Sequence, residues 1–305
     1  MTRKKITIVG AGFVGSTAAH WIAAKGLADI ILVDIDEGIA KGKALDLQQA
    51  MIMNNKDIKI IGTNSYEQTK GSDIVVVTAG IPRKPGMSRD ELISINSKIV
   101  EDICNKLKEY CPDTILIIVT NPLDAMVYKV YKLMGLPKNK IVGMAGMLDS
   151  ARFKHFICEA TGNSPKEVDA MVLGTHNNSM VPLASKATIN QVPLKQVLNK
   201  EKITGIIEKT KNGGAEIVKL LGKGSAYYTP GLGIMEMVEA ILKDQKKLLP
   251  CTAYCEGEYG AKDIFIGVPV ILGKSGVEEI VEMVLEEQQQ MNESIKHIKK
   301  LIDSL

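Results

Sequence analysis

The chain has 305 residues, of which 45% are hydrophobic, so it can build a large core and has the length of about two domains. Its formal net charge of +3 and its aromatic content of 4% argue against nucleic acid as a partner. The sequence opens directly on a strand pattern with no signal peptide before it, and no apolar run approaches membrane-spanning length, so we expect a cytoplasmic protein with no membrane partner.

The first half alternates short apolar runs with longer helical ones. The expected strands are Lys5–Val9, Asp29–Val33, 58–61, 73–78, 114–120 and 140–142, and the expected helices are Phe13–Lys25, Glu37–Met53, 90–110 and 122–134. The runs 73–78 (DIVVVT) and 114–120 (TILIIVT) are uniformly apolar, which is typical of a parallel sheet covered on both faces. The alternation predicts right-handed βαβ units, and therefore an α/β domain with a doubly wound parallel sheet over residues 1–143.

The pattern changes after Gly143. Strands are expected at 168–173, 249–255 and 264–272, and helices at 148–160, 202–221, 231–243 and 277–304. This mixture predicts a second, α+β domain over residues 144–305.

The five cysteines show neither zinc-site nor CxxC spacing. Cys251 and Cys255 are close in sequence, and we interpret them as a buried pair on a strand. We therefore expect reduced thiols, as in a cytosolic protein, and no metal.

A glycine-rich loop, Gly10-Ala-Gly12-Phe-Val-Gly15, follows the first strand and precedes a helix. Such a loop gives a tight turn, a close approach of the backbone to a pyrophosphate, and close packing of helix on strand. Asp34 ends the second strand about 20 residues later, where a carboxylate can accept both ribose hydroxyls and repel a 2′-phosphate. The pattern predicts a Rossmann domain that binds NAD in preference to NADP. The alternatives are a turn without a ligand and, for Asp34, a cap on the helix that follows.

Only four of the 38 basic residues are arginines. Arg83 and Arg89 share one Gly/Pro loop, and Arg152 lies near the start of a predicted helix. Because arginine grips a carboxylate with a planar fork of donors, three converging arginines would form a pocket for a small carboxylate-bearing molecule. The alternative is that codon bias thinned the arginines and chance placed the rest.

His176 lies in a loop that leaves a strand, and histidine can exchange a proton with a hydroxyl near neutral pH. Asp149 is a candidate for the carboxylate that would hold its other ring nitrogen. Asp149 and Arg152 are spaced i and i+3 on a predicted helix face. From spacing alone, an exposed ion pair and an unremarkable loop histidine are favoured.

Seven segments in order resemble one family over nearly the whole chain. They are GAGFVG, Asp34, TAGIPRKPGMSRDEL, VTNPLD, LDSARF, LGTHNNSMVP and GSAYYTPG. Together they are similar to the lactate/malate dehydrogenase superfamily, and most similar to its malate dehydrogenases of the lactate-dehydrogenase-like type. No single segment is this specific. The resemblance implies an NAD-dependent oxidoreductase that transfers a hydride between NAD and malate or oxaloacetate.

The resemblance also implies roles for individual residues. Gly10, Gly12, Gly15 and Asp34 would hold NAD, and Asn121 would contact the nicotinamide ribose and the substrate oxygen. His176 would be the general acid/base with Asp149 as its partner. Arg152 would bind the C1 carboxylate of the substrate, and Arg89 would polarise its reacting carbonyl.

Arg83 occupies the family's specificity position, where lactate-type members usually carry glutamine and malate-type members carry arginine. The loop from Gly80 to Arg89 would be a lid over a dicarboxylate substrate.

The alternative functions are a lactate or other 2-hydroxyacid dehydrogenase and, from another class, a non-catalytic NAD-binding protein. A methyltransferase would leave the arginines without a role. The resemblance further implies a homodimer or homotetramer and a place in the tricarboxylic acid cycle.

One segment departs from the family pattern. The family usually has Gly-Asp after the histidine, whereas this chain has Asn177-Asn178. We hypothesise that His176 is more acidic than in relatives that keep the aspartate, because its imidazolium loses a stabilising neighbour.

Overall fold

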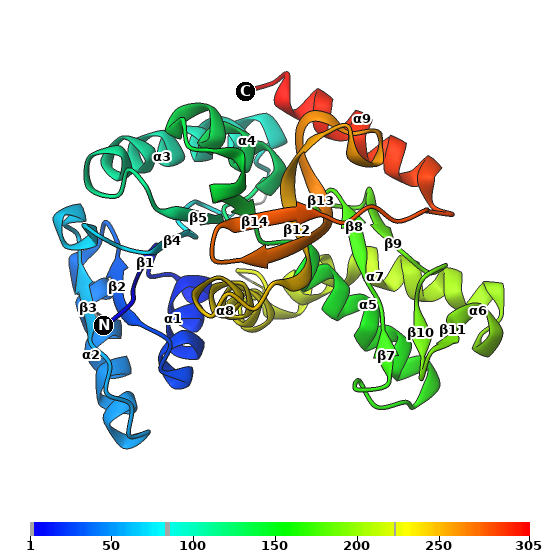
Figure 1. The fold of residues 1–305 in the computed structure, drawn as a ribbon, viewed down its shortest axis with the longest axis horizontal. Coiled ribbons are helices and arrows are strands. Elements are labelled where there is room, and N and C mark those ends of the chain that lie inside the picture. Colours follow the sequence, from blue (N-terminus) through cyan, green and yellow to red (C-terminus); the bar gives the residue numbers. More distant parts are fainter. Residues whose placement is uncertain (1–2, 83–85, 223) are drawn as a thin grey trace.

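The first half of the chain supplies the parallel part of one large mixed sheet (Figure 1). The computed structural model describes residues 3–82, 86–222 and 224–305, with the exception of the side chain of Arg89. The strands of this half are β1 Lys5–Val9, β2 Asp29–Val33, β3 Ile60–Thr63, β4 Ile74–Val77, β5 Ile115–Ile118 and β6 Ile141–Gly143, and the helices are α1 Phe13–Lys25, α2 Glu37–Met53, α3 Arg89–Tyr110 and α4 Leu123–Met134. Their order in the sheet, β3-β2-β1-β4-β5-β6, is doubly wound and confirms the predicted fold class.

Both faces of this parallel sheet are covered, as the uniformly apolar strands predicted. Helices α1 and α2 pack on one face, and α3 and α4 pack on the other (Figure 1). Every residue of β4 and β5 is buried, because alternate side chains point into two different apolar clusters.

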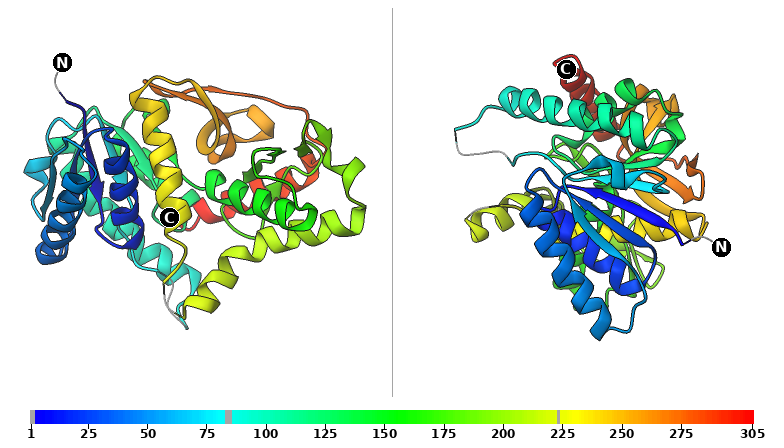
Figure 2. Two further views of the ribbon diagram at one scale, coloured as in Figure 1. Left: turned by 90° about the horizontal axis from the view of Figure 1, so that it is seen from below. Right: turned by 90° about the vertical axis from the view of Figure 1, so that its left-hand side faces the viewer.

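The second half continues the same sheet with antiparallel strands. Its elements are α5 Gly146–Thr161, β7 Val168–Asp169, β8 Val172–Gly174, β9 Met180–Pro182, β10 Thr188–Ile189, β11 Val192–Pro193, α6 Leu194–Val197, α7 Lys200–Leu221, α8 Tyr228–Leu242, β12 Lys247–Glu256, β13 Lys262–Gly273, β14 Gly276–Ile280 and α9 Gln288–Ile302. Short 3-10 turns lie at Tyr66–Thr69, Lys138–Lys140 and Glu258–Gly260. Strand β12 pairs with β6 and with β13, so the two halves share one sheet. Helix α8 contacts both α1 and α5, and so lies between the halves (Figure 2).

Two predicted elements of the second half were wrong. The helix predicted over 277–304 is a strand, β14, followed by a loop and the shorter helix α9. Val277 and Ile280 are spaced as on a helix, but Gly276 turns the chain at φ +90° and β14 pairs with β13. The single strand predicted over 168–173 is two strands, because β7 joins a small three-stranded sheet whereas β8 pairs with β13.

Cys251 and Cys255 lie buried on β12, as predicted. Burial raises the pKa of each thiol to about 12. Both cysteines are therefore protonated, apolar parts of the core. Among the helices that the structure describes, none has the length and apolarity needed to span a membrane.

Candidate active site

The glycine-rich loop joins β1 to α1, and each of its glycines has a distinct geometry. Gly10 has φ +106°, which favours glycine, and its N–H donates to Val33 O at 2.7 Å. A Cβ at Gly15 would lie 1.9 Å from Gly10 O, so any side chain there would push α1 off the strand. A Cβ at Gly12 would meet no described atom within 4 Å. The backbone at Gly12 is therefore open to a ligand at the N-terminus of α1.

Asp34 follows β2 at the carboxyl end of the sheet and faces this loop. Its Oδ2 accepts a hydrogen bond from Ala11 N at 2.7 Å, and its Oδ1 accepts one from Asp36 N at 3.1 Å. The cap of α2 is Asp36, whose side chain accepts from Ile39 N, and not Asp34. The Nζ of Lys43 donates to Ala11 O at 2.6 Å, which places a positive charge beside the glycine loop. The arrangement suits an anionic ligand with a hydroxyl-bearing end.

A single carboxylate connects His176 with Arg152. Asp149 lies on α5 and is only 2% exposed. Its Oδ2 lies 2.7 Å from His176 Nδ1, and its Oδ1 accepts from Arg152 Nη1 at 3.0 Å. The side chains of His176 and Arg152 are 17% and 14% exposed. The structure thus brings together three predicted site residues in a largely buried group, unlike the exposed ion pair that spacing alone favoured.

The charges around His176 favour its protonated form. Burial by itself lowers the pKa of His176 and is the largest single influence. The charge of Asp149, the hydrogen bond to Asp149 and the charge of Asp124 act in the opposite direction, whereas the charge of Arg152 opposes them. The net result is a pKa for His176 above its ordinary value.

Arg152 packs against two glycines of α7. A Cβ at Gly214 would lie 3.4 Å from both terminal nitrogens of Arg152, and one at Gly213 would lie 3.5 Å from its Cδ. The Nε of Arg152 is buried and has no hydrogen-bond partner among the described residues. The guanidinium is therefore held in place by packing and by Asp149 while part of its donor capacity is unused.

Asn121 lies between β5 and α4, again at the carboxyl end of the parallel strands. Its backbone oxygen accepts from Asn96 Nδ2 at 2.6 Å. The fully buried Asn96, on α3, also exchanges hydrogen bonds with the backbone N and O of Ile81. Asn96 thus fastens the chain after β4 to the chain after β5. Asn96 was not predicted as a site residue from the sequence. The available signal was a polar asparagine at an apolar position of an amphipathic helix.

The predicted positions of the Arg83 and Arg89 side chains are not tested by the structure. Arg83 lies outside the described residues, and the side chain of Arg89 does too. The backbone of Arg89 opens α3, where Ser88 caps the helix and Glu91 completes a capping box. The predicted convergence of three arginines stays a prediction.

Asp124 is a second acid beside His176 that sequence reasoning did not single out. It lies in the first turn of α4, is 2% exposed, and its Oδ2 accepts from His176 N at 3.1 Å. The available signal was its position in the segment Asn121-Pro-Leu-Asp124, directly before a run of apolar helix residues.

The departure at Asn177 has a local explanation. Its Oδ1 accepts from Thr175 Oγ1 at 2.9 Å and from Ser179 N at 2.8 Å, which is the bonding of an Asx turn. The asparagine side chain thus closes the turn that follows His176. The neighbouring Asn178 is exposed.

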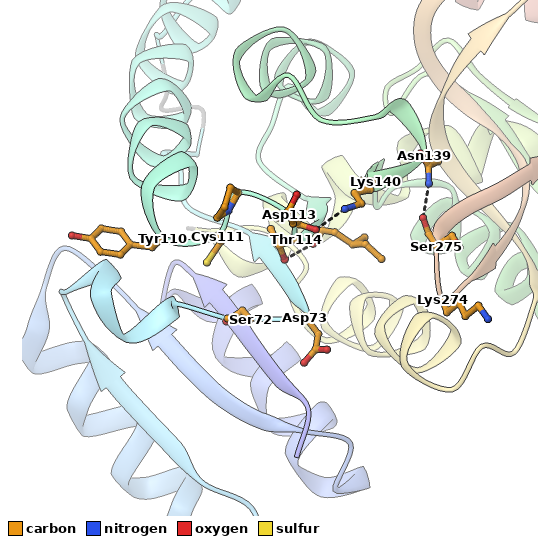
Figure 3. Close-up of a pocket in the computed structure, with 13 residues that line it drawn as sticks. Ser72, Asp73, Tyr110, Cys111, Asp113, Thr114, Asn139, Lys140, Lys274 and Ser275 are labelled. Atoms are coloured by element: carbon orange, nitrogen blue, oxygen red, sulfur yellow. Dashed lines mark hydrogen bonds between the residues drawn. The ribbon is translucent and has the colours of Figure 1, made fainter. Parts of the chain in front are cut away.

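A separate cavity of about 700 Å³ lies at the opposite edge of the sheet (Figure 3). Its lining includes Asp73 before β4 and Thr114 before β5, together with Lys140 and Ser275. Asp73, Thr114 and Lys140 lie at the amino ends of parallel strands, whereas open α/β sheets bind ligands at the carboxyl ends. None of the predicted site residues that the structure describes lines this cavity. Nor does any group of metal-binding side chains occur among the described residues.

Comparisons with known proteins place both halves of the chain in one family. Residues 4–143 match the NAD-binding domain of lactate/malate dehydrogenase, and residues 146–305 match the alpha/beta C-terminal domain of lactate/malate dehydrogenase. The chain is 53% identical to the malate dehydrogenase of Heliobacterium modesticaldum, over 99% of this chain and 98% of that protein. It is 50% identical to the malate dehydrogenase of Bacillus subtilis, over 100% and 99% of the two chains.

Solved structures agree in fold. The crystal structure of Cryptosporidium parvum malate dehydrogenase matches with a TM-score of 0.97 and 43% identity, over 100% of this chain and 99% of that one. The lactate dehydrogenase of the same organism, solved with lactic acid and nicotinamide adenine dinucleotide, matches with a TM-score of 0.96 and 41% identity, over 99% and 98%. Because a malate and a lactate enzyme fit almost equally well, the fold by itself does not separate the two substrates.

Proposed function

The chain belongs to the lactate/malate dehydrogenase family, and on this premise we propose that His176 is its general acid/base and Asp149 the partner of that histidine. The protein is an NAD-dependent malate dehydrogenase, as the names of relatives about 50% identical over the full chain indicate. The observation that carries the residue assignment is the 2.7 Å contact between His176 Nδ1 and Asp149 Oδ2, made inside the protein.

The residues around the glycine loop fit NAD. The open backbone at Gly12 and the N-terminus of α1 suit the pyrophosphate, and Asp34 suits the adenosine ribose. Bound NAD supplies the hydride acceptor for malate, and its reduced form supplies the hydride for oxaloacetate. Asp34 would repel the 2′-phosphate of NADP, so we propose NAD as the preferred cofactor.

The proton chemistry follows from how His176 is held. Because the carboxylate of Asp149 accepts at Nδ1, this nitrogen carries a proton and leaves Nε2 to face the substrate. For malate oxidation, neutral Nε2 removes the hydroxyl proton as the hydride leaves. For oxaloacetate reduction, protonated Nε2 returns that proton to the oxygen, and Asp149 stabilises the charged ring.

Arg152 is the proposed anchor for the substrate's C1 carboxylate. Its largely buried guanidinium, with an unused Nε donor, can make a charge-assisted pair of hydrogen bonds. By resemblance, Arg89 would polarise the carbonyl, Arg83 would balance the second carboxylate, and Asn121 would contact the substrate oxygen. Arg83 would be buried without a partner if pyruvate were bound, so selection would be partly repulsive.

An NADH assay separates the malate enzyme from its lactate rival. Loss of NADH absorbance is followed with oxaloacetate and with pyruvate side by side. We expect a clear preference for oxaloacetate, and a preference for pyruvate would overturn the substrate assignment.

The role of His176 is tested by His176→Asn, which keeps a polar side chain of similar reach but cannot carry the proton. We expect kcat for oxaloacetate to fall by about 10²- to 10⁴-fold. Binding of NADH, followed by its fluorescence, should be unchanged. His155→Asn, on the same helix as Arg152 but with no part in the site, is the control. Retention of activity by the His176 variant would refute the assignment.

We also propose that the enzyme is a homodimer or homotetramer. Helices α2 and α7 expose large apolar side chains that a second copy could cover: Ile39, Leu45, Ile52, Met53, Val218, Leu220 and Leu221. Light scattering on the purified protein gives the mass directly.

The proposed division into an NAD-binding domain and a substrate domain falls at Gly143, the last residue of β6. A cytoplasmic location stays an expectation from the sequence.

A further inference from the structure

Asp124 reaches His176 from the other half of the molecule. It stands on α4, whereas His176 follows β8 and Asp149 stands on α5. Asp124 contacts the backbone of His176, because its Oδ2 accepts from His176 N at 3.1 Å, whereas Asp149 contacts the ring. Two buried carboxylates from different elements therefore converge on one residue.

The neighbouring amide is held in a different way. Thr175 N donates to Ser294 Oγ of α9 at 2.8 Å, and Ser294 is fully buried. A neutral hydroxyl is therefore enough to fix a backbone N–H in this loop. Asp124 differs from Ser294 because it brings a negative charge close to the histidine, and that charge favours the protonated form of His176.

We propose that Asp124 is a positioning residue whose negative charge, together with that of Asp149, stabilises the imidazolium of His176 during turnover. This inference rests on the proposed role of His176. The charged groups that face His176 among the described side chains are Asp149 and Arg152 of α5 and Asp124 of α4. The positive charge of Arg152 disfavours protonation of His176, whereas the negative charges of Asp149 and Asp124 favour it. The direction agrees with the raised pKa of His176, to which the charge of Asp124 contributes.

The two hydrogen bonds to the loop provide a matched pair of variants. Asp124→Asn removes the charge but keeps an oxygen that can accept from His176 N. Ser294→Ala removes a backbone acceptor next to the histidine without changing any charge. A purely structural role for Asp124 predicts that the two variants behave alike. A charge role predicts that only Asp124→Asn alters how His176 titrates.

The experiment is an NMR titration of the four histidine rings in the enzyme without cofactor, with the His176 signal assigned from its loss in His176→Asn. We expect the pKa of His176 to fall in Asp124→Asn and to keep its wild-type value in Ser294→Ala. In steady-state assays, oxaloacetate reduction by Asp124→Asn at pH 8 should fall by at least about threefold more than at pH 6. If Asp124→Asn does not fold, Asp124→Ser supplies a neutral hydroxyl acceptor of the kind that serves Thr175.

An unchanged titration of His176 in the folded charge-removing variant would overturn the inference. An equal change in Ser294→Ala would overturn it as well, because geometry alone would then explain the shift. Neither result depends on turnover, so both can be told apart from a failure of the proposed function. That failure would appear as activity in His176→Asn.

Discussion

Arg152 and Asp149 lie one helical turn apart on α5 and are joined by a hydrogen bond of 3.0 Å between Nη1 and Oδ1, with only 2% of Asp149 exposed. Since the other oxygen of Asp149 binds His176, the carboxylate fixes the proposed substrate anchor and the proposed proton carrier relative to each other. A substrate held by Arg152 is thereby placed in a defined position with respect to the ring. Orientation of this kind contributes to rate without any change in the chemistry.

The two directions of the reaction should respond to pH in opposite ways. The pKa of His176 is raised above its ordinary value, so its imidazolium persists to higher pH than that of an ordinary histidine and is lost as the pH rises through the raised pKa. The kcat/KM for oxaloacetate should therefore be high on the acid side and fall as the pH rises. The kcat/KM for malate should rise over the same interval, because the neutral ring is needed there. Profiles that bend in the same direction would contradict a single acid/base group.

Asn178→Asp should raise the pKa of His176 further, since it restores a negative charge two residues from the ring. The fall in oxaloacetate reduction should move to higher pH. Position 178 is exposed, so salt screens the charge placed there. The shift of the pH profile should therefore be larger at about 10 mM salt than at high salt. The pH profiles of both proteins at two salt concentrations provide the measurement. Identical profiles would remove the proposed reason for a more acidic histidine in this chain.

Gly214→Val should disturb substrate binding through Arg152. A Cβ at this position would lie 3.4 Å from both terminal nitrogens of Arg152, so the methyl groups of valine would displace the guanidinium. We expect kcat/KM for oxaloacetate to fall by about 10- to 100-fold, with little change in the KM for NADH. Gly205→Val is the control, because it lies on the same helix and a Cβ there meets no described atom within 4 Å. Equal losses in both variants would show a general effect on α7.

Arg83→Gln should shift the substrate preference towards pyruvate. Arg83 lies outside the described residues, so this prediction rests on the resemblance at the specificity position. Loss of a charge-assisted contact to the second carboxylate should lower kcat/KM for oxaloacetate by about 10- to 100-fold, and pyruvate reduction should improve. Lys84→Gln removes a charge from the same loop and serves as the control. An unchanged ratio of the two rates would count against the assignment.

Much of the first half could be predicted from sequence because its signals are local. Uniformly apolar strands such as β4 and β5 imply burial on both faces, and Gly10, Gly12 and Gly15 mark the turn into α1. The second half was less predictable because its short strands are defined by distant partners. Residues 276–280 became a strand through pairing with β13, against their helical spacing.

The candidate site shows the same division. His176, Asp149 and Arg152 could be named from sequence, chiefly through the resemblance, whereas their contacts required the fold. Asp124 and Asn96 were missed because each acts on the backbone of a segment that is remote in sequence. A pattern within one helix carries no information about which distant N–H or carbonyl a side chain will meet.

The pairing of β12 with β6 has a consequence for how the protein unfolds. A Cβ at Gly143 would lie 2.8 Å from Thr252 Cβ, so the two strands meet closely at the seam. A fragment truncated after residue 143 would leave β6 as an uncovered edge and remove the helix that packs against α1. Heating should consequently melt the cofactor half and the substrate half in one cooperative transition, and neither half should survive proteolytic separation as an independent module.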